Sequence, residues 1–275
     1  MTLREVLTWS EQVLQEHDVP EAKLNAWYLF AAHFHLNRSS FFLREKEQAD
    51  EQIQSLLEKD LMRRAEREPL EYILGETEFM GLRMYVNEHV LIPRQDTECL
   101  VERVLPMCED KDVLDLCTGS GCIGISLAKL GRCRSVTLSD VSEKALAIAG
   151  KNAQENDVQA NIVQGDLFDS VSGRMFDCIV SNPPYIKSEV VNELMPEVRD
   201  YEPHLALDGR EDGLYFYRKI IEQGREYLRT DGVLAFEIGY DQGVAVSNEM
   251  IKAGYGDVHV YQDLAGVDRV VIGRK

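Results

Sequence analysis

The chain has 275 residues, of which 44% are hydrophobic and 28% are charged. A typical domain has ~150 residues, so this length allows about two domains, and the composition excludes disordered and fibrous classes. Thirty basic and 48 acidic side chains give a net charge of −18. This charge argues against bare nucleic acid or an anionic membrane as the main partner, because both are bound through Lys and Arg.

No segment approaches the roughly 18 apolar residues of a membrane span, and Met1–Glu5 does not begin a signal peptide. We therefore expect a cytoplasmic protein without a membrane partner. The six cysteines form no Cys-x-x-Cys pair and have no paired histidines nearby, which disfavours a zinc site. We expect reduced, mostly buried thiols and no bound metal.

Residues 1–74 are predicted to form an all-helical bundle. Thr2 and Glu5 have the spacing of a capping box at the start of a first helix, and Asp18 with Pro20 favours the start of a second. The apolar stripe of a further helix consists of Ile53, Leu56, Leu57, Leu61 and Met62. The segment holds 9 basic and 14 acidic residues, so it does not have the charge of a nucleic-acid-binding arm.

Residues 75–90 are predicted to connect this bundle to a second domain. Apolar and polar positions alternate over 77–87 around Met80-Gly81, which predicts a β-hairpin. The domain at 91–275 then alternates strands with helices. Expected strands are 112–117, 135–139, 161–164, 176–181, 232–238, 257–261 and 269–272, and expected helices are 124–130, 142–155, 214–228 and 242–253. This order predicts an α/β fold with a parallel or mixed sheet, whose ligands bind beyond the carboxyl ends of the strands.

Arg94 and Glu98 lie on the segment that joins the two domains, just before the first strand of the sheet. Their spacing of four residues allows a mutual ion pair. The alternative is that they close the pocket, so both are weak candidates for substrate binding.

A glycine-rich loop follows the first strand of the sheet. Gly119-Ser120-Gly121 turns the buried strand into an apolar helix, and glycine there allows close approach of a ligand or a positive φ. Asp140 ends the next strand about twenty residues later, where a carboxylate can accept both ribose hydroxyl protons. The pattern predicts a nucleotide-like cofactor and still allows NAD, and the alternative is a tight turn without a ligand.

Asp115 helps to distinguish NAD from other nucleotide-like cofactors. Its carboxylate precedes the loop, where it would organise the loop or reach an ammonium group but would repel a pyrophosphate. This favours S-adenosyl-L-methionine. Asp166 ends the third strand and would accept the adenine amino group, with Leu167 or Phe168 against the ring, although an Asx turn is the alternative. The candidate cofactor-binding residues are Asp115, Cys117, Thr118, Gly119, Ser120, Gly121, Asp140, Asp166, Leu167 and Asn182.

The fourth strand runs directly into Asn182-Pro183-Pro184-Tyr185, our candidate catalytic segment. Two prolines fix φ and remove backbone donors, which leaves a rigid elbow rich in carbonyl groups. The Asn182 side-chain oxygen and the Pro183 carbonyl can accept both hydrogens of a planar NH2 group, while Tyr185 offers a flat face. Such acceptors raise the electron density on a poorly nucleophilic nitrogen, which predicts N-methylation by in-line positioning.

These motifs resemble those of class I amino-group methyltransferases that use S-adenosyl-L-methionine. Over nearly the whole chain, the sequence also resembles the bacterial peptide chain release factor glutamine methyltransferases, the PrmC or HemK family. The segments that carry this resemblance are 91–98, 115–121, 182–185, 202–203, 206–207, 237–239 and 263–269.

The resemblance implies a Rossmann-like class I methyltransferase fold with a mostly parallel seven-stranded sheet, and an amino-terminal bundle that docks the release factor. It implies methyl transfer from S-adenosyl-L-methionine to the side-chain nitrogen, N5, of the glutamine in the Gly-Gly-Gln motif. Cys117 stands where the family usually has glycine, Gln95 where it commonly has proline, and Leu167 where an aromatic residue often packs beside the adenine. We expect a monomer with release factors as partners.

Three alternatives remain at the level of sequence. A nucleic-acid N-methyltransferase acting on adenine or cytosine would use the same segment, but the acidic charge makes DNA an unlikely partner. An NAD-dependent oxidoreductase would use the same glycines, yet no hydride-transfer acid is evident. A non-catalytic binding module would use the bundle alone.

Overall fold

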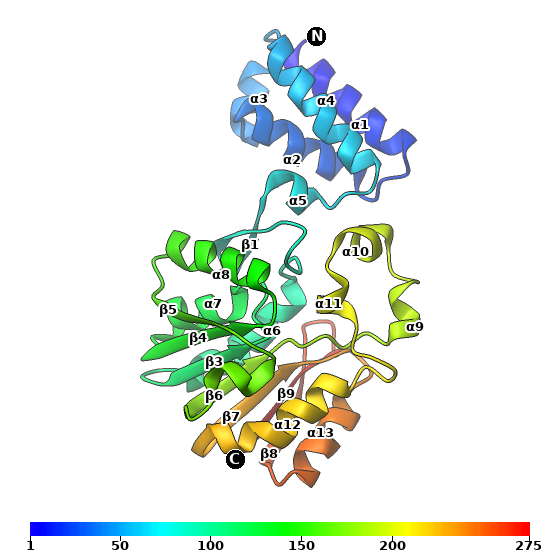
Figure 1. Cartoon of the computed structure of the whole chain (residues 1–275). Coiled ribbons are helices and arrows are strands. Elements are labelled where there is room, and N and C mark those ends of the chain that lie inside the picture. The colour runs from blue at the N-terminus through cyan, green and yellow to red at the C-terminus, as the bar shows by residue number, and fades with distance from the viewer. The chain divides into compact units, whose positions relative to one another are not determined.

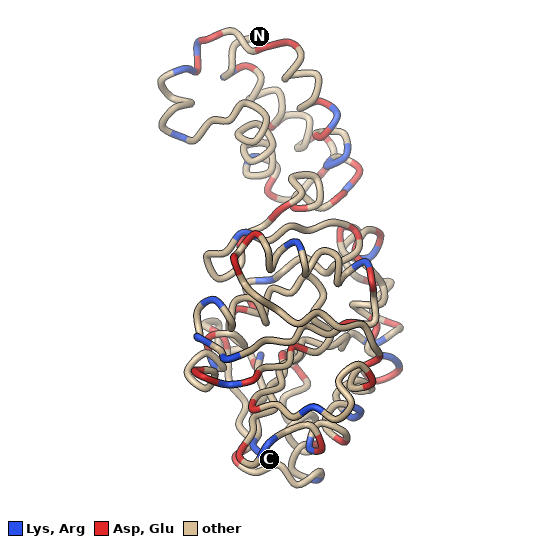
Figure 2. Tube along the Cα trace, turned by 60° about the vertical axis from the view of Figure 1, so that its left-hand side comes forward, with Lys and Arg blue, Asp and Glu red and all other residues tan.

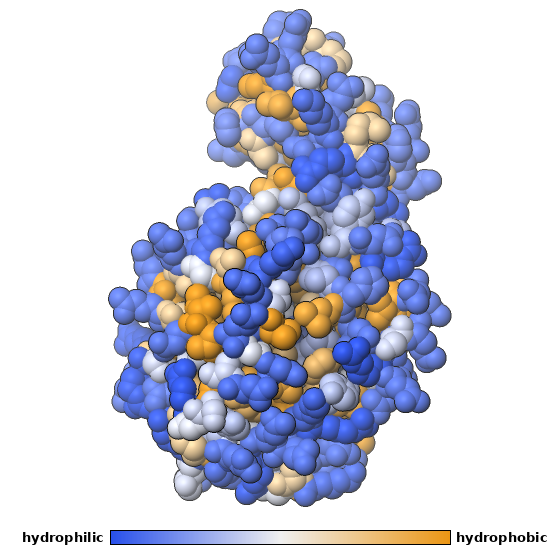
Figure 3. Space-filling view, viewed as in Figure 1, coloured by the Kyte–Doolittle hydropathy of each residue, from blue (hydrophilic) through white to orange (hydrophobic).

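The computed structural model describes all 275 residues and groups them into two compact units (Figure 1). The helical unit comprises residues 1–75 and 195–201, and the sheet unit comprises residues 76–194 and 202–275. Basic and acidic residues are interspersed along the trace (Figure 2). Hydrophilic side chains dominate the face seen in Figure 3, where hydrophobic ones gather in smaller areas. No helix combines the length and the apolar character that crossing a membrane requires.

The helical unit packs around one apolar core. Its helices are α1 (Leu3–Glu16), α2 (Ala22–Phe34), α3 (Arg38–Arg44), α4 (Glu51–Ala65), α5 (Leu70–Leu74) and α10 (Pro196–Tyr201). The predicted capping box is present, because Thr2 accepts from the Glu5 backbone and the Glu5 carboxylate accepts from the Thr2 backbone. In α4 the predicted stripe is partly wrong, since Leu56 and Met62 are exposed and only Leu57 and Leu61 are buried at its centre.

Helix α10 interrupts the predicted range 91–275, because it groups with the helical unit. Its Glu197 is 8% exposed and lies between two arginines of that unit. The Glu197 carboxylate accepts from Arg64 at 2.9 Å and from Arg67 at 2.7 Å. Arg64 is itself buried and also donates to Asn25 at 2.7 Å. A charged cluster therefore lies inside the helical unit and includes a helix that sequence periodicity did not reveal.

Replacing Glu197 by alanine is expected to lower the free energy of unfolding by about 3 kcal/mol, because the buried Arg64 charge loses its partner. Burial raises the pKa of Glu197, but hydrogen bonds from Arg67 and Arg64 outweigh burial and the net pKa is lowered. The stabilisation is therefore present above the ordinary pKa and is lost as the pH falls through the folded value. Urea unfolding at pH 7 and pH 4 measures both effects. A pH-independent difference between the variant and the native chain would contradict this account.

Seven strands form the sheet of the second unit in the order β5-β4-β3-β6-β7-β9-β8. They are β3 (Asp112–Leu116), β4 (Ser135–Asp140), β5 (Ala160–Gln164), β6 (Phe176–Ser181), β7 (Leu228–Glu237), β8 (Gly256–Gln262) and β9 (Asp268–Arg274). Only β9 runs against its neighbours. The predicted mixed, mostly parallel seven-stranded sheet is confirmed. The strand order reverses at β3, so β3 and β6 meet at the point where open α/β sheets bind ligands.

Helices cover both faces of this sheet. The helices that pack on it are α6 (Gln95–Val104), α7 (Cys122–Gly131), α8 (Glu143–Glu155), α12 (Tyr215–Tyr227) and α13 (Gly243–Lys252). The short helices α9 (Ser188–Val191) and α11 (His204–Leu207) belong to the segment that connects β6 to α12. Alternate residues of β3 enter two separate cores, Val113 on one face and Leu114 with Leu116 on the other. This alternation explains why the neighbouring residues Val113 and Leu114 are both apolar.

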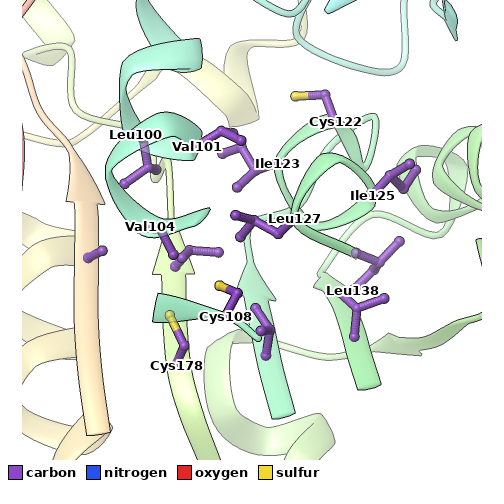
Figure 4. Packing of buried hydrophobic residues seen from close by; sticks show 14 of the residues in the cluster. Leu100, Val101, Val104, Cys108, Cys122, Ile123, Ile125, Leu127, Leu138 and Cys178 are labelled. Carbon is purple, nitrogen blue, oxygen red and sulfur yellow. The ribbon is translucent and has the colours of Figure 1, made fainter. Parts of the chain in front are cut away.

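Helix α6 is the main element missing from the sequence-based assignment, which treated its residues as a connector. Its apolar positions Leu100, Val101 and Val104 are fully buried. They point toward Ile123 and Leu127 of α7 (Figure 4). The spacing of three and four residues was a helical signal. The other connector was predicted correctly, since β1 (Glu76–Phe79) and β2 (Leu82–Tyr85) pair as a hairpin.

Candidate active site

A pocket opens at the carboxyl ends of β3, β4 and β6. It encloses about 1000 Å³ of space that no atoms fill, part of which is open to solvent. The loops that follow these three strands, and the loop after β5, form much of its wall. The predicted site residues that line it are Arg94, Cys117, Thr118, Gly119, Ser120, Asp140, Asp166, Leu167, Asn182 and Pro184. The topology therefore brings together residues that are up to 90 positions apart in the printed sequence.

The other predicted site residues, Glu98, Asp115, Gly121, Pro183 and Tyr185, do not line the pocket. Asp115 is fully buried beneath the glycine loop. Its carboxylate accepts from the Thr118 hydroxyl at 2.6 Å and from the Gly124 backbone at 2.9 Å. Burial raises the pKa of Asp115 to about 7. Of the two roles predicted for Asp115, the structure supports organisation of the loop.

The glycine loop has the backbone geometry that the sequence predicts. Gly119 has φ +55° and a Cβ there would meet no atom within 4 Å, so its backbone faces open space. Gly121 has φ +84° and a Cβ would lie 2.8 Å from Ile125 of α7. Cys117 also has a positive φ, +57°, at the position where the resembling family usually has glycine. The loop therefore leaves room for a ligand at Gly119 and packs tightly at Gly121.

Asp140 joins the glycine loop to the end of β4. One of its carboxylate oxygens accepts from the Gly119 backbone and the other from the Ser142 backbone, both at 2.9 Å. Burial raises the pKa of Asp140, although these backbone donors act in the opposite direction. A carboxylate has about four lone-pair sites, so the oriented carboxylate keeps the capacity to accept from a ligand.

The charge of the pocket fits a cationic or zwitterionic ligand. Asp140 and Asp166 both line it, while the guanidinium of Arg94 forms an ion pair with Glu202. A pyrophosphate would face two carboxylates, whereas a sulfonium or ammonium group is attracted by them. Leu167 lines the pocket, but Phe168 is buried and stacks on Tyr227 with ring centroids 4.5 Å apart. Of the two apolar residues considered for the adenine ring, only Leu167 is available.

Asn182 and its prolines leave the sheet beside the glycine loop. Leu116 of β3 pairs with Ser181 of β6, and the Ser181 hydroxyl donates to the Leu116 carbonyl at 2.7 Å. The next residue of each strand therefore starts a pocket-lining loop. Pro183 is buried next to Asn182, so its contribution to a ligand is limited to its backbone carbonyl.

Tyr185 is held from two directions by residues that sequence reasoning missed. Its hydroxyl donates to Glu237 at 3.3 Å, and its carbonyl accepts from Gln242 at 3.0 Å. Gln242 also accepts from the Gly239 backbone at 2.9 Å. Glu237 and Gly239 belong to a segment that carried the family resemblance, but spacing alone gave no sign that they would reach Tyr185.

Arg94 and Glu98 do not pair with each other, which corrects that alternative. Arg94 is the N-cap of α6 with extended backbone, so the spacing rule for helical neighbours does not apply to it. It pairs with Glu202, while Glu98 accepts from the Met80 backbone at 2.6 Å. Arg94 stays a pocket residue, and Glu98 fixes the turn of the hairpin.

Other pocket-lining residues were also missed, among them Thr97 of α6, Phe216 of α12 and the segment 203–206. Thr97 accepts a hydrogen bond from the Asn182 side chain at 3.5 Å. The amphipathic pattern of 95–104 would have located Thr97 on a helix. Nothing local in the sequence indicated that Phe216 would face the pocket.

Comparisons with known proteins agree with this architecture. The family described as PrmC N-terminal domain matches residues 5–75, and the Methyltransferase small domain matches residues 95–199. The release factor glutamine methyltransferase of Geobacter sulfurreducens is 40% identical over 99% of this chain and 96% of its own length. Its counterpart from Koribacter versatilis is 36% identical over 100% of this chain and 99% of its own length.

Solved structures support the fold of the sheet unit. A methyltransferase from Pyrococcus furiosus has a TM-score of 0.56 at 20% identity and covers 72% of this chain and 90% of its own. A 16S rRNA N2 G1207 methyltransferase of T. thermophilus, in complex with AdoMet and guanosine, has a TM-score of 0.52 at 15% identity and covers 73% and 49%. The sheet unit therefore has the fold of class I methyltransferases.

Proposed function

The chain belongs to the family of release factor glutamine methyltransferases, and on this premise we propose that it methylates the N5 side-chain nitrogen of the glutamine in the Gly-Gly-Gln motif of peptide chain release factors. S-adenosyl-L-methionine is the methyl donor and S-adenosyl-L-homocysteine the product. The observation that carries the proposal is Asn182-Pro183-Pro184-Tyr185 at the end of β6, beside an acidic pocket with a glycine loop. The segment can hold a planar amide, and the pocket suits a sulfonium.

We propose that the cofactor lies along the loops after β3, β4 and β5. Asp140 would accept the ribose hydroxyls, Asp166 the adenine amino group, and the Gly119 backbone would approach the donor closely. When bound, the donor supplies a methyl group on a positively charged sulfur, which becomes a neutral thioether. Asp115 does not touch the donor in this arrangement and holds Thr118 in place.

We propose that Asn182 and Pro183 orient the substrate. The Asn182 side-chain oxygen and the Pro183 carbonyl accept the two amide hydrogens, so the nitrogen gains electron density and faces the methyl group in line. No charged base acts before the attack. The nitrogen releases one proton after transfer, to water or a nearby acceptor. This chemistry needs no metal, because fixed dipoles and positioning supply the catalysis.

We further propose that the helical bundle at 1–74 binds the release factor, and that the protein acts as a cytoplasmic monomer. Binding energy from such a remote contact would position a glutamine whose own contacts are few. The PrmC N-terminal match over 5–75 supports a role specific to this family.

Replacing Asp140 by asparagine is expected to weaken S-adenosyl-L-homocysteine binding at least about tenfold. An asparagine has one acceptor oxygen instead of two, so a backbone donor of Gly119 or Ser142 would face an NH2 group. Isothermal titration calorimetry measures the affinity. Asp169→Asn is the matched control, because Asp169 is exposed on the turn after β5. Equal affinities for the native chain and both variants would remove Asp140 from the cofactor site.

The test of the proposed function is methyl transfer from labelled S-adenosyl-L-methionine to a purified release factor. Parallel reactions contain the factor with its Gly-Gly-Gln glutamine replaced, and duplex DNA. We expect label on the intact factor alone. Label on DNA alone would transfer the same chemistry to a nucleic-acid base, and label on both factors would place the methyl group on another residue.

A further inference from the structure

A buried carboxylate lies behind the catalytic segment. Glu237 ends β7 and is only 2% exposed. One of its oxygens accepts from the Tyr185 hydroxyl at 3.3 Å, and the other, Oε2, has no hydrogen-bond partner. An unpartnered buried carboxylate oxygen is costly, so such a group needs an explanation in a folded protein. None of the steps described above uses it.

Thr97 connects this carboxylate to Asn182. The Thr97 side chain is 2% exposed and its oxygen accepts from Asn182 Nδ2 at 3.5 Å. Burial raises the pKa of Glu237 to about 7, and hydrogen bonding by Thr97 and by Tyr185 acts in the opposite direction. Thr97 therefore lies between the Asn182 amide and the Glu237 carboxylate. Bonds of this length in a free enzyme often tighten when substrate binds.

The chemistry of these groups sets the direction of each hydrogen bond. An ionised carboxylate only accepts, so Tyr185 donates to it, and a Thr97 hydroxyl that bonds to it must also donate. The Thr97 oxygen is then left as an acceptor, and it selects the NH2 group of Asn182. The opposite atom, Asn182 Oδ1, is consequently turned away from Thr97. Without such a neighbour, an asparagine amide can flip, because its oxygen and nitrogen ends are nearly the same shape.

We propose that Glu237 and Thr97 are positioning residues that fix the orientation of the Asn182 amide, so that its oxygen and not its nitrogen faces the substrate. The proposal rests on the role of Asn182 in the proposed function. A flipped Asn182 would present two donors to the amide hydrogens of the substrate and would repel them. Oε2 has no hydrogen-bond partner in the free protein, and in this proposal it is the acceptor toward which the Thr97 hydroxyl turns.

Protonated Glu237 would no longer fix the orientation of the Asn182 amide, because a carboxylic acid can donate a hydrogen bond as well as accept one. The charged and titratable groups around Glu237 are Tyr185, Tyr217 of α12, Cys122 of α7, Asp96 of α6 and Arg269 of β9. Asp96 and Arg269 pair with each other at 3.0 Å. The pKa of Glu237 is raised, so the carboxylate is ionised above about pH 7. We therefore expect kcat to rise with pH through this range and then to level off.

The experiment measures single-turnover methylation of the release factor between pH 6 and pH 9 for a set of variants of the full chain. Glu237→Gln and Thr97→Val are expected to lower the rate at pH 8 at least about tenfold, with KM for the release factor and the affinity for S-adenosyl-L-homocysteine within about threefold. Glu237→Gln should also lose the rise of kcat near pH 7. This loss would assign the rise to Glu237 and not to Asp115, whose pKa is raised as well. Thr97→Ser keeps the hydroxyl and should retain the native rate.

Thr137→Val is the matched control, because Thr137 is also fully buried but lies in β4 away from Asn182. It should lower the melting temperature without changing the pH profile. A native rate and profile for Glu237→Gln would overturn the proposal, as would equal rates for Thr97→Val and Thr97→Ser. If Glu237→Gln does not fold, the Thr97 pair decides alone. Asn182→Ala, measured alongside, separates the two levels: full activity of that variant would exclude the role of Asn182, whereas no label on the release factor with the native chain would refute the proposed function itself.

Discussion

Replacing Asn182 by alanine lowers the rate of methyl transfer at least about a hundredfold, which is the typical cost of removing one preorganised hydrogen-bond partner from an active site. The substrate amide would keep the Pro183 carbonyl as its only acceptor in the proposed arrangement. Asn182 is half-buried at the pocket wall and its backbone follows the paired end of β6. The truncation therefore removes an acceptor and leaves the sheet unchanged.

Affinity for S-adenosyl-L-homocysteine should change by less than about fivefold in this variant, because the ribose and adenine contacts are proposed for other loops. Single-turnover kinetics give the rate, and calorimetry gives the affinity. Asn161→Ala in β5 is the control, since that asparagine is exposed and its side chain contacts only the Val136 carbonyl, at 3.4 Å. A rate within threefold of the native chain would exclude the clamp mechanism.

The sequence was sufficient for features that depend on neighbouring residues. The strands β3 and β6 are short and mostly apolar, and the motifs that follow them are contiguous. Gly119, Asp140 and Asn182 could be placed at one edge of the sheet because parallel strands bring their carboxyl ends together. The strands of the sheet and the main pocket loops could therefore be predicted from local patterns.

The residues that hold these loops in place could not be predicted from the sequence, because they belong to distant elements. Thr97, Glu237 and Gln242 reach the catalytic segment from α6, β7 and the start of α13. The packing of the helices decides which buried polar groups contact one another. No rule based on residue spacing predicts this packing. The error at Arg94 has the same origin, since its partner Glu202 lies 108 residues away.

The loop at 208–213 shows most clearly what the sequence could not reveal. Its acidic, glycine-containing sequence predicts a solvated loop, and Asp208 and Asp212 do pair with nearby arginines. Its glycines, however, pack against the catalytic segment. A Cβ at Gly209 would lie 2.7 Å from the Tyr185 backbone. The loop is therefore a structural support of the active site as well as a surface segment.

Replacing Gly213 by alanine is expected to lower the methylation rate about thirtyfold. Gly213 has φ +73°, and a Cβ would lie 2.3 Å from the Tyr185 carbonyl oxygen and 2.8 Å from Gln242 Nε2. The new methyl group would occupy the space of the hydrogen bond between these two groups, so the catalytic segment must move. Misplacement of a reacting group by about 1 Å can cost on the order of a hundredfold in rate. Cofactor affinity should stay within about threefold, because the glycine loop is not touched.

Gly173→Ala separates this effect from backbone strain. Gly173 has a nearly equal φ, +76°, but a Cβ there would meet no atom within 4 Å. Both variants should lose about 1 kcal/mol of stability from the unfavourable φ, and only Gly213→Ala should lose activity. Thermal unfolding and single-turnover rates of the two variants give the comparison. Equal methylation rates of the two variants would mean that Tyr185 and Gln242 shift without moving Asn182. The catalytic segment would then be less rigid than its two prolines and its hydrogen bonds imply.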